Sequence, residues 1–154
     1  MKYASVSKPR VAAQVLLVDD NQNGLSARKS LLEEQGYVIV TASSGEEALE
    51  AVAKGKFDLM VTDFRMPKMN GIELIGRVRQ LQPQLSIILL SGIAGPLGLD
   101  EKSTGADAVI SKGAHEIANL QRSVARLLAR KTPRKPPGSQ TNGTPKAGSR
   151  AKSV

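Results

Sequence analysis

The strongest constraint on the fold is an alternation of short apolar runs and helix-like segments, repeated five times between residues 11 and 130. The apolar runs are "QVLLV", "YVIVTA", "FDLMVT", "LSIILL" and "ADAVIS". The intervening segments carry apolar residues near helical spacing, among them Leu25, Leu31 and Leu32, and later Ile75, Val78 and Leu81. This alternation predicts an α/β fold in which helices cover a parallel sheet.

The character of each run predicts its place in the sheet. The runs "VLLV", "LMV" and "IILL" are the most continuously apolar, which is typical of central strands buried on both faces. The second and fifth runs are shorter and more mixed, so we expect them at the two edges.

The helices differ in how strongly the sequence predicts them. Ser44 followed by Glu47 predicts a capping box at the start of one helix. The longest helix should run from Ala114 to about Arg130, with one apolar face formed by Ile117, Leu120, Val124 and Leu127. In contrast, "GIAGPLGLDEKSTG" contains four glycines and a proline, which predicts a short, poor or mobile helix.

Composition limits the class of protein. The 154 residues suit one domain with a substantial core, which we place at 13–130 after an N-terminal extension at 1–12. There is no cysteine and only one histidine, His115, so disulfides, thiolate metal sites and His-rich zinc sites are excluded. No signal peptide or membrane span is evident, so we expect a cytoplasmic protein without membrane contact.

The last 24 residues, 131–154, form a tail of a different composition. The tail holds six Lys or Arg and no acid, and so carries most of the net charge of +8. It is rich in Pro, Gly, Ser and Thr, which predicts disorder. It either serves as a solubilising tail or contacts nucleic acid or an acidic surface, together with a basic stripe formed by Arg122, Arg126 and Arg130.

Polar residues stand where the predicted strands end: Asp19 and Asp20, Asp63, Ser91 and Lys112. Each alone could be a turn former or a helix cap. Because the carboxyl ends of parallel strands meet at one edge of the sheet, together they predict a site that gathers three acids, a hydroxyl and a lysine.

The chemistry of that set is specific. Three crowded carboxylates repel one another and raise each other's pKa, which a divalent cation relieves. Mg²⁺ prefers oxygen ligands and commonly combines one or two carboxylates with a phosphate. Lys112 and Ser91 offer a cation and a hydroxyl to a phosphoryl group, and an aspartate can itself become an aspartyl phosphate. We therefore predict Asp63 as the residue that accepts a phosphoryl group.

The blocks "LLVDDN", "VTDFRMPKMNG", "ILLSG" and "ADAVISKG" resemble the signature blocks of the response-regulator receiver domain, of the chemotaxis-regulator kind, over about residues 13–130. The resemblance implies a doubly wound, flavodoxin-like sheet of five parallel strands in the order 2-1-3-4-5, with helices on both faces. It also implies phosphorylation that depends on Mg²⁺. The implied metal ligands are the carboxylates of Asp19, Asp20 and Asp63 and the backbone carbonyl of Arg65.

The same resemblance assigns the remaining site residues. Asp63 corresponds to the phosphoacceptor, Ser91 to the switch hydroxyl and Lys112 to the phosphate-contacting lysine. The side chain of Arg65 either tunes the phosphoryl lifetime or has no role. His115 is interpreted as a surface or capping residue rather than a phosphorelay histidine.

Three features depart from the family pattern. Val109 stands three residues before the lysine, where the family usually has Tyr or Phe. Gly113 follows the lysine, where proline is usual. The glycine-rich segment before the fifth strand is unusual as well. Acceptor chemistry is therefore expected to be intact, while the output switch is expected to be altered.

The expected function is that of a stand-alone receiver in a two-component or phosphorelay pathway, without external substrates of its own. A histidine kinase or histidine phosphotransfer protein would supply phosphate, and output would pass through binding to a downstream protein. One alternative is a degenerate receiver that binds partners without phosphorylation, with possible nucleic-acid contact through the tail. A haloacid-dehalogenase-like phosphatase is disfavoured, because its D-x-D motif follows the first strand, where this chain reads "DDNQN".

Overall fold

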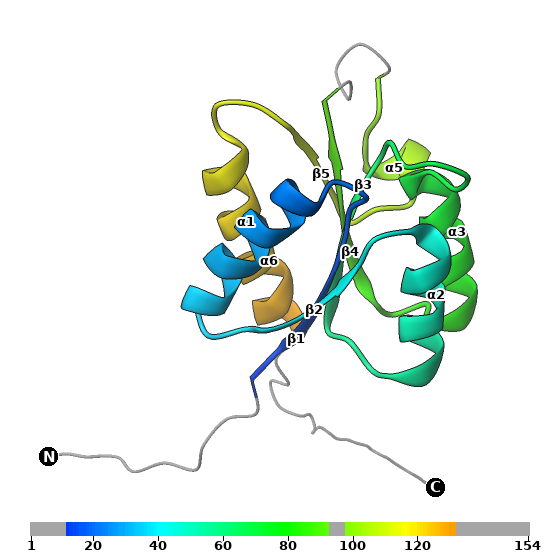
Figure 1. Ribbon diagram of the computed structural model, residues 1–154, viewed down its shortest axis with the longest axis horizontal. Helices are drawn as coiled ribbons and strands as arrows, with labels where there is room; N and C mark the ends of the chain where they lie inside the picture. Colours follow the sequence, from blue (N-terminus) through cyan, green and yellow to red (C-terminus); the bar gives the residue numbers. More distant parts are fainter. Residues whose placement is uncertain (1–11, 93–97, 132–154) are drawn as a thin grey trace, which may run out of the picture.

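A computed structural model describes residues 12–92 and 98–131 as one parallel sheet between two helical layers (Figure 1). The proposed extension and tail, apart from Ala12 and the backbone of Lys131, lie outside the described residues. The strands are β1 (Gln14–Val18), β2 (Val38–Ala42), β3 (Leu59–Asp63), β4 (Ser86–Ser91) and β5 (Ala108–Ser111). Their order is β2-β1-β3-β4-β5 and every neighbouring pair is parallel, which confirms the predicted sheet and its two edge strands.

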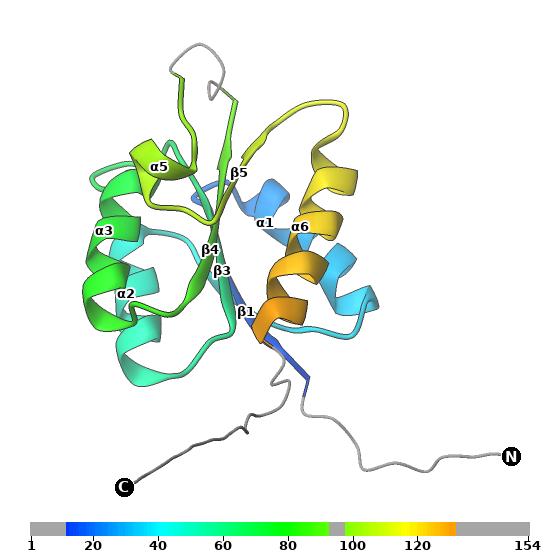
Figure 2. The same ribbon diagram turned by 180° about the vertical axis from the view of Figure 1, so that it is seen from behind.

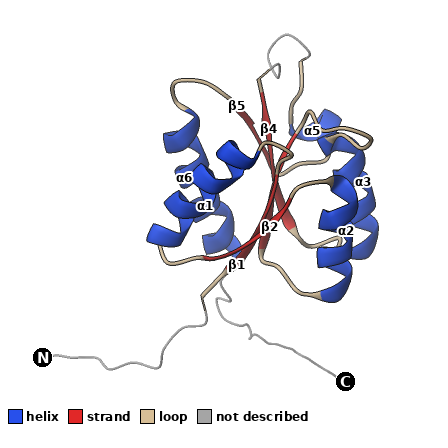
Figure 3. Ribbon diagram, viewed as in Figure 1, coloured by secondary structure: helices blue, strands red, loops and turns tan. Residues whose placement is uncertain are grey.

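The helices cover both faces of the sheet, as predicted. One face is covered by α1 (Gln22–Glu34) and α6 (Glu116–Lys131). The other is covered by α2 (Gly45–Lys54), α3 (Gly71–Leu81) and the four-residue α5 (Glu101–Thr104). Figure 2, seen from behind, and Figure 3, coloured by secondary structure, show the same two layers. Within the described residues, no helix is long and apolar enough to cross a bilayer.

The core consists of two apolar clusters, one on each face of the sheet. Alternate residues of a strand point to opposite faces, so Leu16 and Met60 pack toward α2 and α3 while Leu17 and Val61 pack toward α1 and α6. The central strands are buried on both faces, in agreement with their continuous apolar sequence.

Two residues of the apolar stripes identified in the sequence lie at helix ends and are not buried. Ile117 and Leu81 are 47% and 52% exposed, whereas Leu74, which the spacing did not single out, is fully buried. Ile117 lies in the first turn of α6 and Leu81 is the last residue of α3. An apolar stripe therefore predicts burial well only over the middle turns of these helices.

The capping box predicted at Ser44 and Glu47 forms only in its first half. The Ser44 hydroxyl accepts a hydrogen bond from the N–H of Glu47 at 3.1 Å, but the Glu47 carboxylate accepts from the N–H of Ser43 instead of from the cap residue. A full capping box occurs at α3, where Asn70 and Glu73 bond reciprocally at 2.9 Å. This cap fixes the loop that follows β3.

Candidate functional site

The site lies along the edge of the sheet at which the strands end. Asp63 is the last residue of β3 and pairs in register with Leu90, and Ser91 is the last residue of β4. The N–H of Phe64 donates to the carbonyl of Leu90 at 2.8 Å, and the N–H of Lys112 donates to the carbonyl of Ser91 at 3.0 Å. Regular strand pairing thus positions the backbone of the predicted acceptor, hydroxyl and lysine side by side.

The three predicted acids come together at this edge. Asp19, Asp20 and Asp63 each offer a carboxylate oxygen, and the three oxygens lie within 4.8 Å of one another. Asp19 and Asp63 are buried, at 3% and 5% exposure, while Asp20 is exposed to solvent. An all-oxygen donor set with one open side fits a hydrated Mg²⁺ ion, which prefers carboxylates and retains waters.

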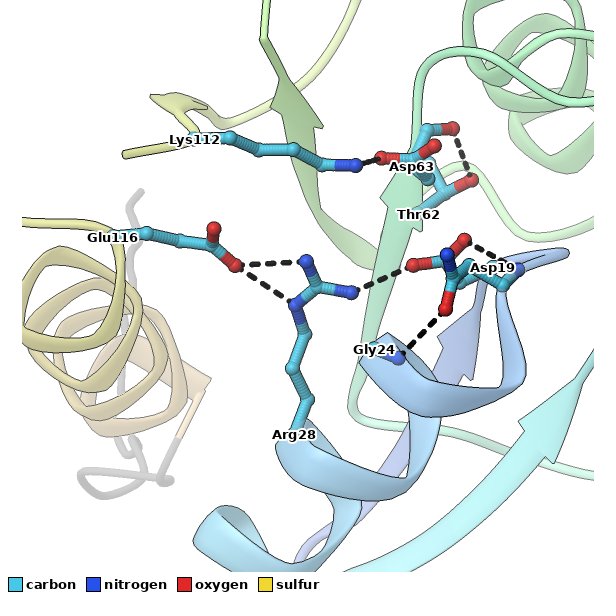
Figure 4. Close-up of polar contacts among 8 residues, drawn as sticks. Asp19, Gly24, Arg28, Thr62, Asp63, Lys112 and Glu116 are labelled. Carbon is cyan, nitrogen blue, oxygen red and sulfur yellow. Dashed lines mark hydrogen bonds and ion pairs between the residues drawn. The ribbon is translucent and has the colours of Figure 1, made fainter. Parts of the chain in front are cut away.

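Asp63 forms an ion pair with Lys112 (Figure 4). The ammonium of Lys112 contacts Oδ1 of Asp63, a buried atom that no hydrogen bond of good geometry reaches within the described residues. Burial raises the pKa of Asp63 above its ordinary value of 3.8; the charge of Asp19 adds to the rise, and Lys112 and Arg28 oppose it. The carboxylate is therefore destabilised in its charged form, which additional positive charge would relieve.

Asp19 is held at both of its carboxylate oxygens. Its Oδ1 accepts a hydrogen bond from the N–H of Asn21 at 2.9 Å. Its Oδ2 accepts a hydrogen bond from Nη1 of Arg28 at 2.7 Å (Figure 4). The other side of the Arg28 guanidinium pairs with Oε2 of Glu116 on α6, at 2.8–2.9 Å. The result is a chain of charges from the acidic site to the first turn of α6.

Sequence reasoning missed Arg28 and Glu116. A signal for Arg28 was present, because it falls between Leu25 and Leu32 on the buried face of α1, where a charge is unexpected. Glu116 offers no such signal, because it stands 88 residues from Arg28 and meets it only through the fold.

The remaining predicted residues differ in how deeply they are buried. Ser91 is 1% exposed at the end of β4, whereas Arg65 is exposed in the loop after β3. His115 is exposed just before α6, as expected of a surface residue. Val109 in β5 is half-buried and packs against the apolar cluster on the α2 and α3 face. Gly113 has a φ of +147°, a conformation that favours glycine.

Comparison with known proteins identifies the family. Residues 15–124 match the response regulator receiver domain. Because this match covers most of the chain, and agrees with the sheet order and the position of the acids, the chain belongs to the response regulator receiver family.

Individual relatives and solved structures agree with this assignment. A gliding motility regulatory protein of Myxococcus xanthus is 34% identical over 120 residues, which cover 74% of this chain and 15% of that protein. The alkaline phosphatase synthesis transcriptional regulatory protein PhoP of Bacillus subtilis is 38% identical over 78 residues, covering 51% of this chain and 32% of that protein. The chain thus spans less than a third of the length of either relative.

Among solved structures, the response regulator TrrA of Thermotoga maritima, in complex with Mg²⁺-BeF, is similar to 75% of this chain with 35% identity and a TM-score of 0.68, and is covered to 98%. The chemotaxis response regulator CheY4 of Vibrio cholerae is similar to 76% of the chain with 30% identity and a TM-score of 0.69, and is covered to 99%. The chemotaxis-regulator character predicted from the sequence is therefore confirmed at the level of the fold.

Proposed function

We propose that Asp63 accepts a phosphoryl group from a histidine kinase or a histidine phosphotransfer protein. A carboxylate oxygen of Asp63 attacks the phosphorus of the donor's phosphohistidine. The new P–O bond forms as the P–N bond breaks, and the released imidazole nitrogen keeps the electron pair and takes up a proton. The observation that carries this proposal is the placement of a buried carboxylate between two further acids and a lysine.

The acidic site fits Mg²⁺, and we propose Asp19, Asp20, Asp63 and the carbonyl of Arg65 as its protein ligands. Three carboxylate oxygens within 4.8 Å supply the hard oxygen donors that this ion requires. When bound, Mg²⁺ would neutralise negative charge on the carboxylates and on the incoming phosphoryl oxygens. The raised pKa of Asp63 supports a need for such charge.

The protein's own residues supply the rest of the proposed chemistry. The ammonium group of Lys112 already contacts Asp63. Once Asp63 is phosphorylated, this ammonium group would instead form an ion pair with a phosphoryl oxygen. Ser91 would donate its hydroxyl to another phosphoryl oxygen. Both roles are transient stabilisation of charge, which fits a phosphoryl acceptor with slow self-phosphorylation and self-dephosphorylation.

Phosphotransfer from a purified kinase tests this assignment. A histidine kinase labelled with radioactive phosphate should transfer label to the wild-type protein and leave Asp63→Asn unlabelled. A matched variant, Asp58→Asn, changes an acid at the opposite end of β3 and should accept label normally. Equal labelling of Asp63→Asn and wild type would show that another residue is the acceptor.

We further propose that output passes through protein–protein interaction. A receiver that binds its partner without phosphorylation is the competing proposal, and Val109 favours it, because a half-buried valine cannot swing inward as an aromatic ring does. The two proposals are distinguished by the affinity of a downstream binding protein for the wild-type chain, measured with and without phosphorylation. Equal affinities would favour the phosphorylation-independent module.

Nucleic-acid contact through the basic stripe and the tail is a separate proposal. Arg122, Arg126 and Arg130 are exposed along α6, immediately before the tail. Filter binding to DNA should weaken with salt, and deletion of residues 131–154 should reduce both the affinity and its salt dependence. Unchanged binding after the deletion would show that the tail does not contact the DNA. The cytoplasmic location expected from the sequence stays a prediction.

A further inference from the structure

Arg28 is a buried cation placed beside the proposed metal site. Its residue exposure is 9%, and it lies on the same face of α1 as Leu25 and Leu32. A β-carbon at Gly24 would lie only 3.2 Å from both Arg28 Nη1 and Asp19 Oδ2, so the lack of a side chain there leaves room for the ion pair. The guanidinium group of Arg28 thus occupies a space that a side chain at residue 24 would narrow.

The contacts of Arg28 divide its charge between two acids. It donates to Oδ2 of Asp19 at 2.7 Å and to Oε2 of Glu116 at 2.8–2.9 Å (Figure 4). Asp19 is also one of the three carboxylates that can meet at one ion. The charge that Asp19 would offer to a metal is therefore already partly neutralised by a residue that stays protonated at all ordinary pH values.

Arg28 cannot be explained as a simple source of stability. Burying an ion pair removes two charges from water, and replacement by apolar residues is often neutral or stabilising. Leu25 and Leu32, the flanking residues on the same face of α1, are apolar and buried. Arg28 is charged although it lies between two apolar residues, and it contacts both Asp19 at the site and Glu116 on α6. These contacts indicate a role at the site.

We propose that Arg28 is a built-in counter-cation that lowers the Mg²⁺ affinity of the acidic site and, through Glu116, couples occupancy of that site to the first turn of α6. This inference rests on the metal site of the proposed function. When Mg²⁺ shares the carboxylate of Asp19, the attraction between Asp19 and Arg28 falls. The guanidinium then interacts more strongly with Glu116, so α6 senses the occupancy of the site.

Two variants with opposite expected effects test the first part of the proposal. Arg28→Met keeps an unbranched apolar stem and removes the charge, so the Mg²⁺ dissociation constant should fall by about tenfold, as expected for one unit charge close to a divalent ion. Among the described residues, Glu116→Gln leaves Arg28 with Asp19 as its one acidic partner, so the constant should rise by about threefold. Isothermal titration with Mg²⁺ at 0.15 M salt measures both.

A neighbouring surface ion pair provides matched controls. Lys29 and Glu33 form an exposed pair on the same helix, with Nζ and Oε2 2.9 Å apart. Lys29→Met and Glu33→Gln make the same two charge changes. Because exposed charges are screened by salt and solvent, the Mg²⁺ dissociation constants of these variants should stay within about twofold of wild type.

Hydrogen exchange tests the coupling to α6. The amide of Asn119 donates to the carbonyl of His115 at 3.0 Å in the first turn of α6. Addition of Mg²⁺ should slow exchange at residues 119 and 120 in the wild-type protein. The effect should be lost in Glu116→Gln, even when enough Mg²⁺ is added to saturate the site.

The outcomes separate this proposal from the function on which it rests. Wild type that binds Mg²⁺, with Arg28→Met and Glu116→Gln unchanged in affinity, would overturn the counter-cation role and leave the metal site intact. Absence of Mg²⁺ binding in wild type and in all variants would overturn both. If Arg28→Met fails to fold, the Glu116→Gln affinity and its hydrogen exchange still decide the question.

Discussion

Gly71 lies directly against Asp63, so that a β-carbon on residue 71 would overlap the carbonyl oxygen of Asp63. It would also crowd Cδ1 of Leu89 and Cα of Phe64. The N–H of Gly71 donates to the carbonyl of Phe64 at 2.7 Å, which ties the first residue of α3 to the residue after β3. The glycine that ends the "DFRMPKMNG" block is thus required by the close approach of two backbones at the acceptor.

We therefore predict that Gly71→Ala destabilises the fold by about 1–3 kcal/mol, the usual range for overpacking a filled site. Gly76→Ala, in the same helix, is the control, because residue 76 is exposed and a β-carbon there would meet no atom of the described residues within 4 Å. That substitution should stabilise by about 0.5–1 kcal/mol through helix propensity. Urea unfolding measures both, and equal effects would contradict the close approach.

Neutralising the acceptor should stabilise the metal-free protein. Burial raises the pKa of Asp63, so the ionised side chain costs folding free energy at neutral pH. In EDTA at pH 7, Asp63→Asn should have a higher free energy of unfolding than wild type. Asp58→Asn should show no such gain, because the Asp58 carboxylate accepts the N–H of Gln14 at 2.8 Å near the surface.

The gain from Asp63→Asn should also depend on pH. The pKa of Asp63 in the folded protein is raised above 3.8, so protonated Asp63 favours the folded state. This contribution to stability is fully present below the unfolded-state pKa. It is lost as the pH rises through the folded-state pKa. The advantage of the asparagine variant should therefore shrink as the pH falls from 7 toward 3.8. An advantage that grows on acidification would show that the folded-state pKa is lowered instead.

The backbone conformation at Gly113 should be incompatible with proline, the residue that the family usually has at this position. Proline requires a φ near −65°, and Gly113 has a φ of +147°. We expect Gly113→Pro to destabilise the fold by about 1–3 kcal/mol. Gly113→Ala should cost about 1 kcal/mol, because no atom of the described residues obstructs its β-carbon but the positive φ still costs free energy. Thermal unfolding compares them; a Gly113→Pro variant as stable as wild type would show that this loop adopts the usual family conformation.

Mg²⁺ should stabilise the folded protein in a manner that requires Asp20. This residue is exposed, so Asp20→Asn should change the free energy of unfolding without metal by no more than about 0.5 kcal/mol. In wild type, Mg²⁺ at 100 times its dissociation constant should add about 2.7 kcal/mol. Asp20→Asn should lose most of that gain. An equal response of both proteins to Mg²⁺ would place the ion elsewhere.

Much of the fold was predictable because it depends on local sequence. Continuous apolar runs identified the buried strands, and the mixed runs identified the edges. The strand order itself came only from the resemblance, since alternation alone does not fix which strands are neighbours. Helix ends were predicted less well: Leu81 and Ile117 continue the apolar spacing, but they lie on terminal turns and are about half exposed.

The site was predictable to the extent that its residues follow strands directly. Asp63 and Lys112 meet because parallel pairing brings the ends of β3, β4 and β5 together. The partnership of Arg28 with Glu116 was not predictable, because it joins two helices that are far apart in the sequence and adjacent only across one face of the sheet. Long-range charge pairs of this kind require the tertiary structure.

Intact mass after incubation with a small-molecule phosphodonor shows whether Asp63 accepts a phosphoryl group. Wild type and Asp63→Asn should be compared with and without Mg²⁺. Wild type with Mg²⁺ should gain the mass of one phosphoryl group, and no gain should occur without the metal or in Asp63→Asn. A phosphoryl gain in Asp63→Asn equal to that of wild type, or no gain in wild type with this donor and with a panel of histidine kinases, would contradict the claim.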